Sequence, residues 1–322
     1  CAGARHGCRT RPAGSVEHDE VLEDRADPAS PLRSSCTRRC DPLVVSNTRP
    51  RRHTVEMATL VCFHAHPDDE AIATGGTMLL ASRAGHRVVL VLATKGEQGE
   101  PVEGVLAPGE ELWRRRVQEA ELSAEILGAH RVEFLGYEDS GMIDEPTNGN
   151  PRSFWQADLD EAAARLAVIL EAESADVLTI YDPHGGYGHP DHINVHRVGT
   201  LAAERVGIDR VFWSTMNRTR IQQLMEDSPD LADSIDDERT EDIEAAEFGT
   251  PEDEITHAVD VCSVLAEKRA AMAAHASQIS SEDFFLSLPL EHFAAAFGTE
   301  WYVEPGRPRD GRAFGVDLFV LS

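Results

Sequence analysis

Short apolar runs alternate along the chain with longer segments in which apolar residues recur every three or four positions. The short runs are typical of buried strands, and the longer segments are typical of amphipathic helices. Because strands alternate with helices, the pattern predicts an α/β protein with a doubly wound, mostly parallel sheet and helices on both faces. The predicted strands are 59–63, 86–93, 131–135, 176–181 and 210–214, with weaker candidates at 255–261 and 316–321, and the predicted helices are 71–84, 112–127, 154–174, 190–206 and 262–277.

Two clusters of histidine and acidic residues follow the first and the fourth predicted strands. Residues 64–70 read His-Ala-His-Pro-Asp-Asp-Glu, and residues 189–192 read His-Pro-Asp-His after a glycine-rich loop. A proline followed by an acidic first turn is also an ordinary helix start, which is the plain alternative for the first cluster. Since the carboxyl ends of parallel strands share one edge of a sheet, we expect the two clusters to meet there.

The residue types in the two clusters suit a divalent metal ion. A catalytic zinc typically has three protein ligands and one open position, and His66, Asp69 and His192 supply two imidazoles and a carboxylate. Neighbouring residues at a helix start diverge by about 100°, so Asp68 is free to face a water molecule while Asp69 holds the metal. We therefore predict that Asp68 is the general base.

Other polar residues of the clusters have predicted roles in handling charge. His189 shares a helix face with His192, and we assign it to stabilise charge or to protonate the leaving amine. Tyr187, which lies between glycines, is predicted to hydrogen-bond a developing oxyanion, and Asp191 is predicted to orient an imidazole from behind. We interpret the remaining histidines near the motifs as packed or solvated residues: His64, His184, His196 and His275. The alternatives are that His64 is a metal ligand and that His275 reaches the site.

The composition excludes some classes of partner. The formal net charge is −27 over 322 residues, which argues against nucleic acid. The sequence contains no run of about 18 apolar residues, so no membrane-spanning helix is expected. Beyond residue 56 the cysteines are Cys62 and Cys262, which fits a reduced cytoplasm. We expect a small-molecule partner, and formation of a homo-oligomer stays open.

The first 56 residues differ from the rest of the chain. They are rich in Arg, Pro and Ser without a periodic apolar pattern, and the first methionine is Met57. We interpret residues 1–56 as disordered, or as a spurious extension from a start site placed too far upstream. The alternative is a zinc-binding head that uses Cys1, Cys8, Cys36 and Cys40.

An acidic segment interrupts the second half of the chain. Residues 226–254 hold 14 acidic residues and one arginine, with no core pattern. We interpret this segment as a solvated insertion in a single domain that spans residues 57–322. A calcium-binding loop is the remote alternative, because the segment lacks the glycine and the regular Asp spacing of such loops.

The motifs Ala-His-Pro-Asp-Asp-Glu at 65–70 and His-Pro-Asp-His at 189–192 resemble the signatures of the LmbE/PIG-L family of metal-dependent N-acetylglucosaminyl deacetylases. The resemblance extends over about residues 57–196 and returns at 268–278. It implies a Rossmann-like fold, zinc with iron as an alternative metal, and hydrolysis of the acetamide of a glucosamine derivative. It also implies the roles given above for five residues: His66, Asp68, Asp69, His189 and His192.

Within the family, His-Gly-Gly-Tyr-Gly-His-Pro-Asp-His and Asp-Ser-Gly-Met are similar to segments of the actinobacterial mycothiol-pathway enzymes. One of these enzymes deacetylates N-acetylglucosaminyl-inositol, and a close relative cleaves mycothiol S-conjugates. The resemblance therefore implies an amino-sugar substrate, with Arg116, Asp139 and Met142 in contact with the sugar or the inositol. An amidase of mycothiol S-conjugates is the alternative, and the acidic segment departs from the family pattern.

Three further classes of function are weaker. A metal phosphoesterase is an alternative because Asp-rich loops also serve two-metal sites. A nucleotide-binding module requires a glycine-rich fingerprint or a phosphate-binding loop after a strand, and the sequence has neither in that position. A serine hydrolase requires Gly-x-Ser-x-Gly after a strand, which the sequence also lacks.

Overall fold

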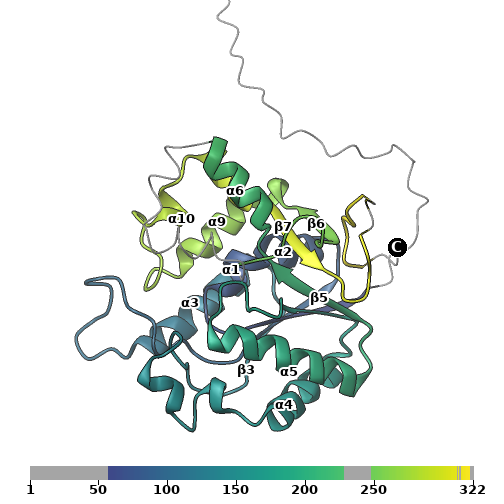
Figure 1. Ribbon diagram of the computed structural model, residues 1–322. Coiled ribbons are helices and arrows are strands. Elements are labelled where there is room, and N and C mark those ends of the chain that lie inside the picture. Colours follow the sequence, from purple (N-terminus) through teal and green to yellow (C-terminus); the bar gives the residue numbers. More distant parts are fainter. Residues whose placement is uncertain (1–56, 228–247, 310, 312, 320–322) are drawn as a thin grey trace, which may run out of the picture. The chain divides into compact units, whose positions relative to one another are not determined.

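The computed structural model describes residues 57–227, 248–309, 311 and 313–319 (Figure 1). These residues belong to one compact unit, Val55–Ser322. The predictions for residues 1–56, and for the acidic segment between 228 and 247, lie outside the described residues. Among the described residues, no helix combines the length and the apolar character needed to cross a membrane.

Seven strands form one sheet in the order β3-β2-β1-β4-β5-β7-β6. The first five strands are parallel to their neighbours, whereas β7 pairs antiparallel with both β5 and β6. The chain therefore forms the predicted doubly wound, mostly parallel sheet, with an antiparallel edge that the sequence pattern did not indicate. The strands are β1 (Thr59–His64), β2 (Arg87–Leu92), β3 (Arg131–Phe134), β4 (Val177–Tyr181), β5 (Arg210–Thr215), β6 (His257–Asp260) and β7 (Thr299–Val303).

The strand order reverses between β1 and β4, which lie side by side with Leu60 opposite Val177. The chain runs outward from β1 through β2 to β3, and then returns to the centre to form β4 on the other side of β1. In doubly wound sheets, such a reversal opens a crevice at the carboxyl ends of the two central strands. The two polar clusters of the sequence follow these two strands.

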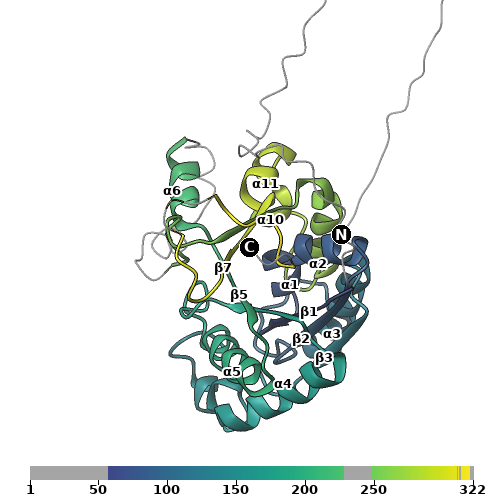
Figure 2. The ribbon, with the colours of Figure 1, turned by 90° about the vertical axis from the view of Figure 1, so that its right-hand side faces the viewer.

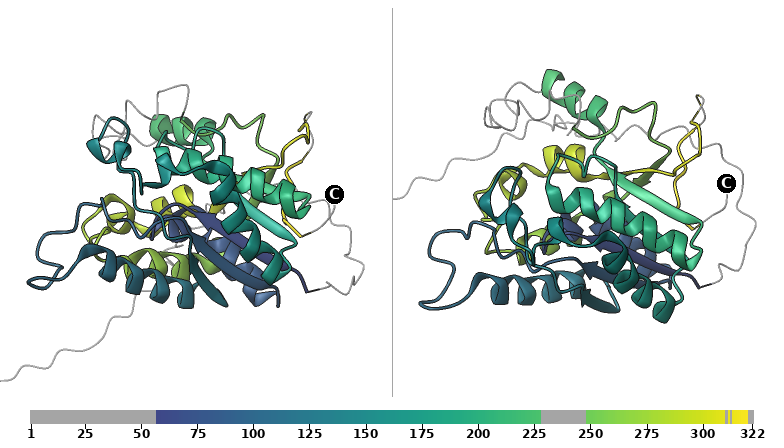
Figure 3. Two further views of the ribbon diagram at one scale, coloured as in Figure 1. Left: turned by 90° about the horizontal axis from the view of Figure 1, so that it is seen from below. Right: turned by 60° about the horizontal axis from the view of Figure 1, so that its bottom comes forward.

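Helices cover both faces of the sheet, and each face has its own hydrophobic core. Helices α4 (Leu159–Glu173) and α5 (Pro190–Val206) lie side by side on one face (Figure 3). Helices α2 (Gly75–Arg83), α3 (Leu112–Ile126) and α9 (Leu265–Ala274) pack together on the other face (Figure 2). The remaining elements are α1 (Asp69–Ala73), α6 (Arg218–Asp227), α10 (Phe284–Ser287), α11 (Leu290–Phe297), η1 (Pro146–Gly149), η2 (Phe154–Gln156) and η3 (Cys262–Val264).

Three predicted helices differ from the structure in their bounds or their continuity. The segment 71–84 is broken at Thr74 into α1 and α2, and Glu300 accepts hydrogen bonds from the first free N–H groups of α2. The segment 154–174 begins with the 3-10 turn η2, and α4 starts only after Asp158, whose side chain caps it by accepting from the N–H of Glu161. The segment 262–277 begins with η3, and its helix ends at Ala274.

Two strand predictions near the end of the chain also needed correction. The candidate at 255–261 is the shorter strand β6, and the described part of the candidate at 316–321 forms no strand. Instead β7 lies between β5 and β6. The isolated bridge that comes nearest to this last segment joins Gly315, just before it, to His257.

Candidate active site

The loops that follow β1 and β4 meet at the carboxyl edge of the sheet. The ring centroid of His66 lies 4.6 Å from that of His189 and 5.4 Å from that of His192. One ring nitrogen from each of these three histidines lies within 4.8 Å of the other two, and all three residues are buried. The structure thus brings together side chains that are more than 120 positions apart in the sequence.

Asp69 lies between two of these imidazoles. Its Oδ2 accepts a hydrogen bond from the backbone N–H of His66 at 2.8 Å and lies 3.4 Å from His66 Nδ1. Its Oδ1 lies 3.4 Å from His192 Nε2. Burial would raise the pKa of Asp69, but His192 and His66 outweigh burial and hold the pKa well below its usual range. The Asp69 carboxylate is therefore ionised and faces two imidazoles.

Hydrogen bonds on the outer side of each imidazole fix its orientation. His192 Nδ1 lies 3.2 Å from the carbonyl oxygen of Gly185 and donates to it, and its Nε2 faces Asp69. His66 Nε2 lies 3.2 Å from Asp191 Oδ2 and donates to it, and its Nδ1 lies on the Asp69 side. Burial would lower the pKa of His66, but Asp139 and the other carboxylates around the ring outweigh burial and raise the pKa well above its usual value. Outer hydrogen bonds of this kind orient metal-binding histidines.

The donor set at this point fits a divalent metal ion. His66, His192 and Asp69 supply two imidazoles and one carboxylate, which are the protein ligands typical of a catalytic zinc. Among the described residues, two groups of donor atoms lie within 4.8 Å of one another: the three histidines His66, His189 and His192, to which Asp69 adds a carboxylate, and a second group that consists of His66, Asp139 and Asp191. Its carboxylates already accept hydrogen bonds, from Ser140 to Asp191 and from the N–H groups of Gln98 and Gly141 to Asp139. The first set is therefore the better candidate.

Asp68 has an unusual backbone and a cationic neighbour. Its φ is 111°, a value that non-glycine residues rarely adopt. Its Oδ2 lies 3.0 Å from the guanidinium of Arg116, and 18% of its side chain is exposed. Burial raises the pKa of Asp68 to about 6, and Arg116 opposes this rise. The carboxylate is thus a base of moderate strength beside the imidazole cluster.

His189 and Tyr187 line the cluster from the β4 side. His189 is the N-cap of α5, and its Nδ1 accepts a hydrogen bond from the N–H of Asp191 at 3.1 Å. Burial and the neighbouring His66 and His192 lower the pKa of His189, so the neutral form with a proton on Nε2 is favoured. The hydroxyl of Tyr187 lies 3.5 Å from His192 Nε2, and the side chain is 41% exposed.

The residues predicted to contact substrate lie in three different settings. Arg116 is 3% exposed and donates to the carbonyl oxygens of Gly96 and Pro67 as well as to Asp68. Asp139 is buried, with Oδ1 3.4 Å from His66 Nε2. Met142 lies at the surface, 36% exposed. Substrate contact by these residues stays a prediction.

Sequence reasoning missed a buried group behind Asp68. Glu70 Oε1 lies 2.6 Å from Ser123 Oγ and 2.6 Å from His275 Nε2, and all three residues are fully buried. The interpretation of His275 as a solvated helix residue is therefore wrong. The alternative, in which His275 reaches toward the site, is closer to the structure, but the Ala-rich segment did not indicate its partner Glu70, which lies 205 positions away.

His64 is also engaged away from the donor set. Its Nδ1 lies 2.8 Å from the hydroxyl of Tyr181, and its Nε2 lies 2.8 Å from Thr74 Oγ1. Burial lowers the pKa of His64 to about 4, so the ring is neutral. Of the other two histidines near the motifs, His184 is exposed, and His196 lies half-buried with Nδ1 2.9 Å from the carbonyl oxygen of Tyr181.

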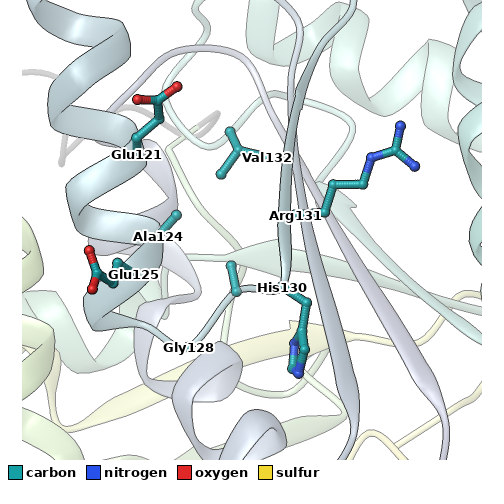
Figure 4. Close-up of a pocket in the computed structure, with 8 residues that line it drawn as sticks. Glu121, Ala124, Glu125, Gly128, His130, Arg131 and Val132 are labelled. Atoms are coloured by element: carbon teal, nitrogen blue, oxygen red, sulfur yellow. The ribbon is translucent and has the colours of Figure 1, made fainter.

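A shallow hollow lies between the end of α3 and the start of β3 (Figure 4). Its lining includes Glu121, His130 and Arg131, and no residue of the histidine cluster. Because β3 is parallel to its neighbour, its start lies at the amino-terminal edge of the sheet, away from the carboxyl edge that holds the cluster. The hollow therefore plays no part in the site.

Comparisons with known proteins agree with this geometry. A family model described as "PIG-L: GlcNAc-PI de-N-acetylase" matches residues 61–204, a range that holds both motifs. A protein of Acidothermus cellulolyticus is 38% identical over 256 residues, which cover 76% of this chain and 88% of the relative. A protein of Salinispora arenicola is 38% identical over 259 residues, which cover 76% of this chain and 83% of the relative. Both are named 1D-myo-inositol 2-acetamido-2-deoxy-alpha-D-glucopyranoside deacetylase.

Among solved structures, a conserved protein of Thermus thermophilus superposes with a TM-score of 0.50. The superposition covers 77% of this chain and 95% of that chain, with 19% sequence identity. At this level of identity the likeness supports the fold alone.

Proposed function

The chain belongs to the PIG-L family of de-N-acetylases, and we propose from this membership and from the site that it hydrolyses the acetamide of an N-acetylglucosamine derivative with the help of a divalent cation. The observation that carries the proposal is the position of Asp69, 3.4 Å from both His66 and His192, with Asp68 next to it. The products are acetate and a free amine.

The substrate proposed is a glucosamine joined to inositol. The relatives from Acidothermus cellulolyticus and Salinispora arenicola carry this substrate in their names, and the chain matches more than four fifths of each. This is the N-acetylglucosaminyl-inositol of the mycothiol pathway that the two motifs already indicated. An amino-sugar substrate also agrees with the strongly negative charge of the chain, since no acidic group of the substrate has to be bound.

We propose His66 Nδ1, His192 Nε2 and the Asp69 carboxylate as the groups that hold the cation, with zinc as the first candidate and iron as the alternative. When bound, such an ion polarises the acetyl carbonyl and makes a water molecule more acidic. The hydrogen bonds from His66 to Asp191 and from His192 to Gly185 restrain the rotation of the two imidazole rings.

Asp68 takes the proton of the attacking water. Its carboxylate is next in sequence to Asp69 but bonds to Arg116 rather than to an imidazole, so it is available as a base. With a pKa near 6 in the protein without metal, it is ionised at neutral pH. A general base of this kind typically accelerates a reaction by about 10²- to 10⁴-fold.

His189 and Tyr187 stabilise the charge that develops during the reaction. The N-cap hydrogen bond at Nδ1 leaves the Nε2–H of His189 free to donate to the oxygen or the amine on which charge changes. The hydroxyl of Tyr187, beside His192, donates to the developing oxyanion from the more exposed side. The glycines that flank Tyr187 leave room for substrate to enter.

The test is release of amine and acetate from a panel of substrates by the metal-loaded protein. The panel contains N-acetylglucosaminyl-inositol, free N-acetylglucosamine, a mycothiol S-conjugate and a phosphate monoester. We expect the highest kcat/KM for N-acetylglucosaminyl-inositol, and loss of turnover after the metal is removed by a chelator. Preference for the S-conjugate would support the amidase alternative, and turnover of the phosphate ester alone would overturn the proposal.

A further inference from the structure

Asp68 is held in a backbone conformation that it does not adopt readily. Its φ of 111° and ψ of −34° lie outside the regions that are comfortable for a residue with a side chain. Such a conformation persists only where the surrounding contacts enforce it. The contacts that enforce it here therefore determine where the Asp68 carboxylate points.

Glu70 makes the contact on the amino side of Asp68. Its Oε2 accepts a hydrogen bond from the backbone N–H of Asp68 at 3.0 Å. This bond links the N–H of Asp68 to a side chain two residues further along, and so ties the backbone at Asp68 to the first turn of α1. The carboxylate is completely buried, so water does not compete for it.

The other oxygen of Glu70 is fixed by two residues from distant parts of the chain. Ser123 Oγ, on α3, donates to Glu70 Oε1 at 2.6 Å. His275, at the carboxyl end of α9, lies with Nε2 2.6 Å from the same oxygen. His275 Nδ1 has no hydrogen-bond partner among the described residues, so a proton on Nε2 faces Glu70 and donates to it.

Arg116 makes a second contact from the opposite side. One nitrogen of its guanidinium donates to the carbonyl oxygen of Pro67 at 2.6 Å and to Asp68 Oδ2 at 3.0 Å. The peptide unit before Asp68 is therefore held at both of its polar atoms, the oxygen by Arg116 and the N–H by Glu70. Glu70 is in turn held by residues that do not touch the catalytic cluster.

We propose that Glu70, fixed by Ser123 and His275, is a positioning residue that sets the backbone of Asp68 and thereby aims its carboxylate. This inference rests on the proposed role of Asp68 as the base. Glu70 does not contact substrate or metal. Its effect is on the rate of the chemical step, because a small displacement of a catalytic group lowers kcat far more than it changes ground-state binding.

The chain offers a matched control for the link between Ser123 and Glu70. Ser277 Oγ donates to Glu119 Oε2 at 2.6 Å, and Ser123 and Ser277 are both fully buried. Ser123→Ala and Ser277→Ala therefore remove the same kind of bond between a buried serine and a carboxylate. Only the first of these bonds leads to Asp68.

We expect Ser123→Ala to lower kcat by about 3- to 10-fold, with KM and bound metal unchanged. We expect Ser277→Ala to lower the melting temperature by about as much as Ser123→Ala does. Unlike Ser123→Ala, it should keep kcat within about twofold of the wild type. Glu70→Gln retains an oxygen that accepts from Asp68 and should keep more of kcat than Glu70→Ala. Equal losses of kcat in the two serine variants, or a wild-type kcat in Glu70→Ala with full metal content, would overturn the proposal.

A readout that needs no turnover separates this inference from the proposed function. Crystal structures of Glu70→Gln and Glu70→Ala report the φ of Asp68 directly. We expect φ to leave the positive region in Glu70→Ala and to stay near the wild-type value in Glu70→Gln. An unchanged Asp68 in Glu70→Ala would contradict the positioning role even if the enzyme acts on another substrate, whereas failure of the wild type to deacetylate would refute the proposed function alone.

Discussion

The phenol ring of Tyr181 lies flat against the imidazole of His192, with the ring centroids 4.3 Å apart and the planes 8° from parallel. Tyr181 ends β4, and its hydroxyl lies 2.8 Å from His64 Nδ1, so the ring cannot rotate freely. The stack and the hydrogen bond from His192 to Gly185 together keep His192 Nε2 turned toward Asp69. The buried strand thus supports a proposed metal ligand.

Loss of this stack is expected to weaken metal binding. In Tyr181→Leu the flat contact is gone, and we expect metal affinity to fall by about 10- to 100-fold, as for other residues that orient ligands. Tyr181→Phe keeps the ring but loses the hydroxyl, and should bind metal more tightly than Tyr181→Leu. Competition with a chelator of known affinity measures both, and equal affinities in the two variants would show that the stack has no role.

Removal of an imidazole from the proposed ligand set is expected to abolish metal binding. His192→Ala leaves two ligands, so the purified variant should contain little metal and show no turnover. The matched control is His184→Ala. His184 lies eight positions earlier in the same segment but is exposed, so this variant should keep both its metal and its turnover. Elemental analysis after desalting measures the metal content of both variants. A His192→Ala protein with a full complement of metal would refute the ligand assignment.

Removal of the base should separate catalysis from metal binding. Asp68→Asn keeps the shape of the side chain but cannot accept a proton, so we expect kcat to fall by about 10²- to 10⁴-fold while the metal content stays at the wild-type level. Amine release and elemental analysis on the same sample provide the two readouts. Turnover near the wild-type rate in Asp68→Asn would rule out its role as base.

The glycine-rich loop that carries Tyr187 offers a test of close packing. Gly185 and Gly188 both have positive φ, at 67° and 92°. A Cβ on Gly185 would lie 2.6 Å from the Cβ of His192, whereas a Cβ on Gly188 would meet nothing within 4 Å. Gly185→Ala should therefore displace His192 and lose metal, while Gly188→Ala suffers only backbone strain of about 1 kcal/mol. Similar metal affinities in the two variants would contradict this packing argument.

Stability at acid pH should depend on a histidine that lies far from the catalytic cluster. His257 on β6 is 1% exposed, and burial lowers its pKa to about 4. Because the unfolded chain binds this proton at about pH 6.5, the neutral folded form is fully favoured above pH 6.5, and stability is lost as the pH falls from 6.5 toward 4. In His257→Asn the slope of the unfolding free energy in this window should be shallower by up to about 1.4 kcal/mol per pH unit.

Urea unfolding of both proteins in the presence of a chelator measures this slope without a contribution from metal. Other groups titrate in the same window, but they are common to the two proteins and cancel in the difference. Identical slopes would mean that protonation of His257 does not oppose folding.

The parallel part of the fold was predictable because buried strands of a doubly wound sheet are continuous apolar runs. Arg131–Phe134 and Val177–Tyr181 were predicted to within one residue at each end. The antiparallel strand β7 was not predicted. In Thr299–Val303 polar and apolar residue types alternate only partly, and the strand pairs with strands far away in the sequence. Helix α6 was also missed, because none of its side chains is buried and its pattern carries no core signal.

The site was predictable where chemistry is concentrated in short motifs and unpredictable where it depends on single distant residues. His66, Asp69 and His192 stood out because metal-binding residue types rarely gather at strand ends by chance. His275 stands alone in an Ala-rich segment, and its burial follows from the packing of α9 against α1 and α3, which periodicity does not reveal. The positive φ of Asp68 is likewise a product of its neighbours rather than of its own residue type.

The contact between Glu70 and His275 joins α1, which follows the first strand, to a segment 205 residues further along. A polypeptide emerging from the ribosome presents both histidine motifs well before His275 is synthesised. If Glu70 positions the base through this contact, a growing chain that already carries both motifs lacks a correctly aimed base until α9 has been translated and packed. The enzyme would then become active late in synthesis, when α9 packs against α2 and α3 and completes the hydrophobic core on that face of the sheet.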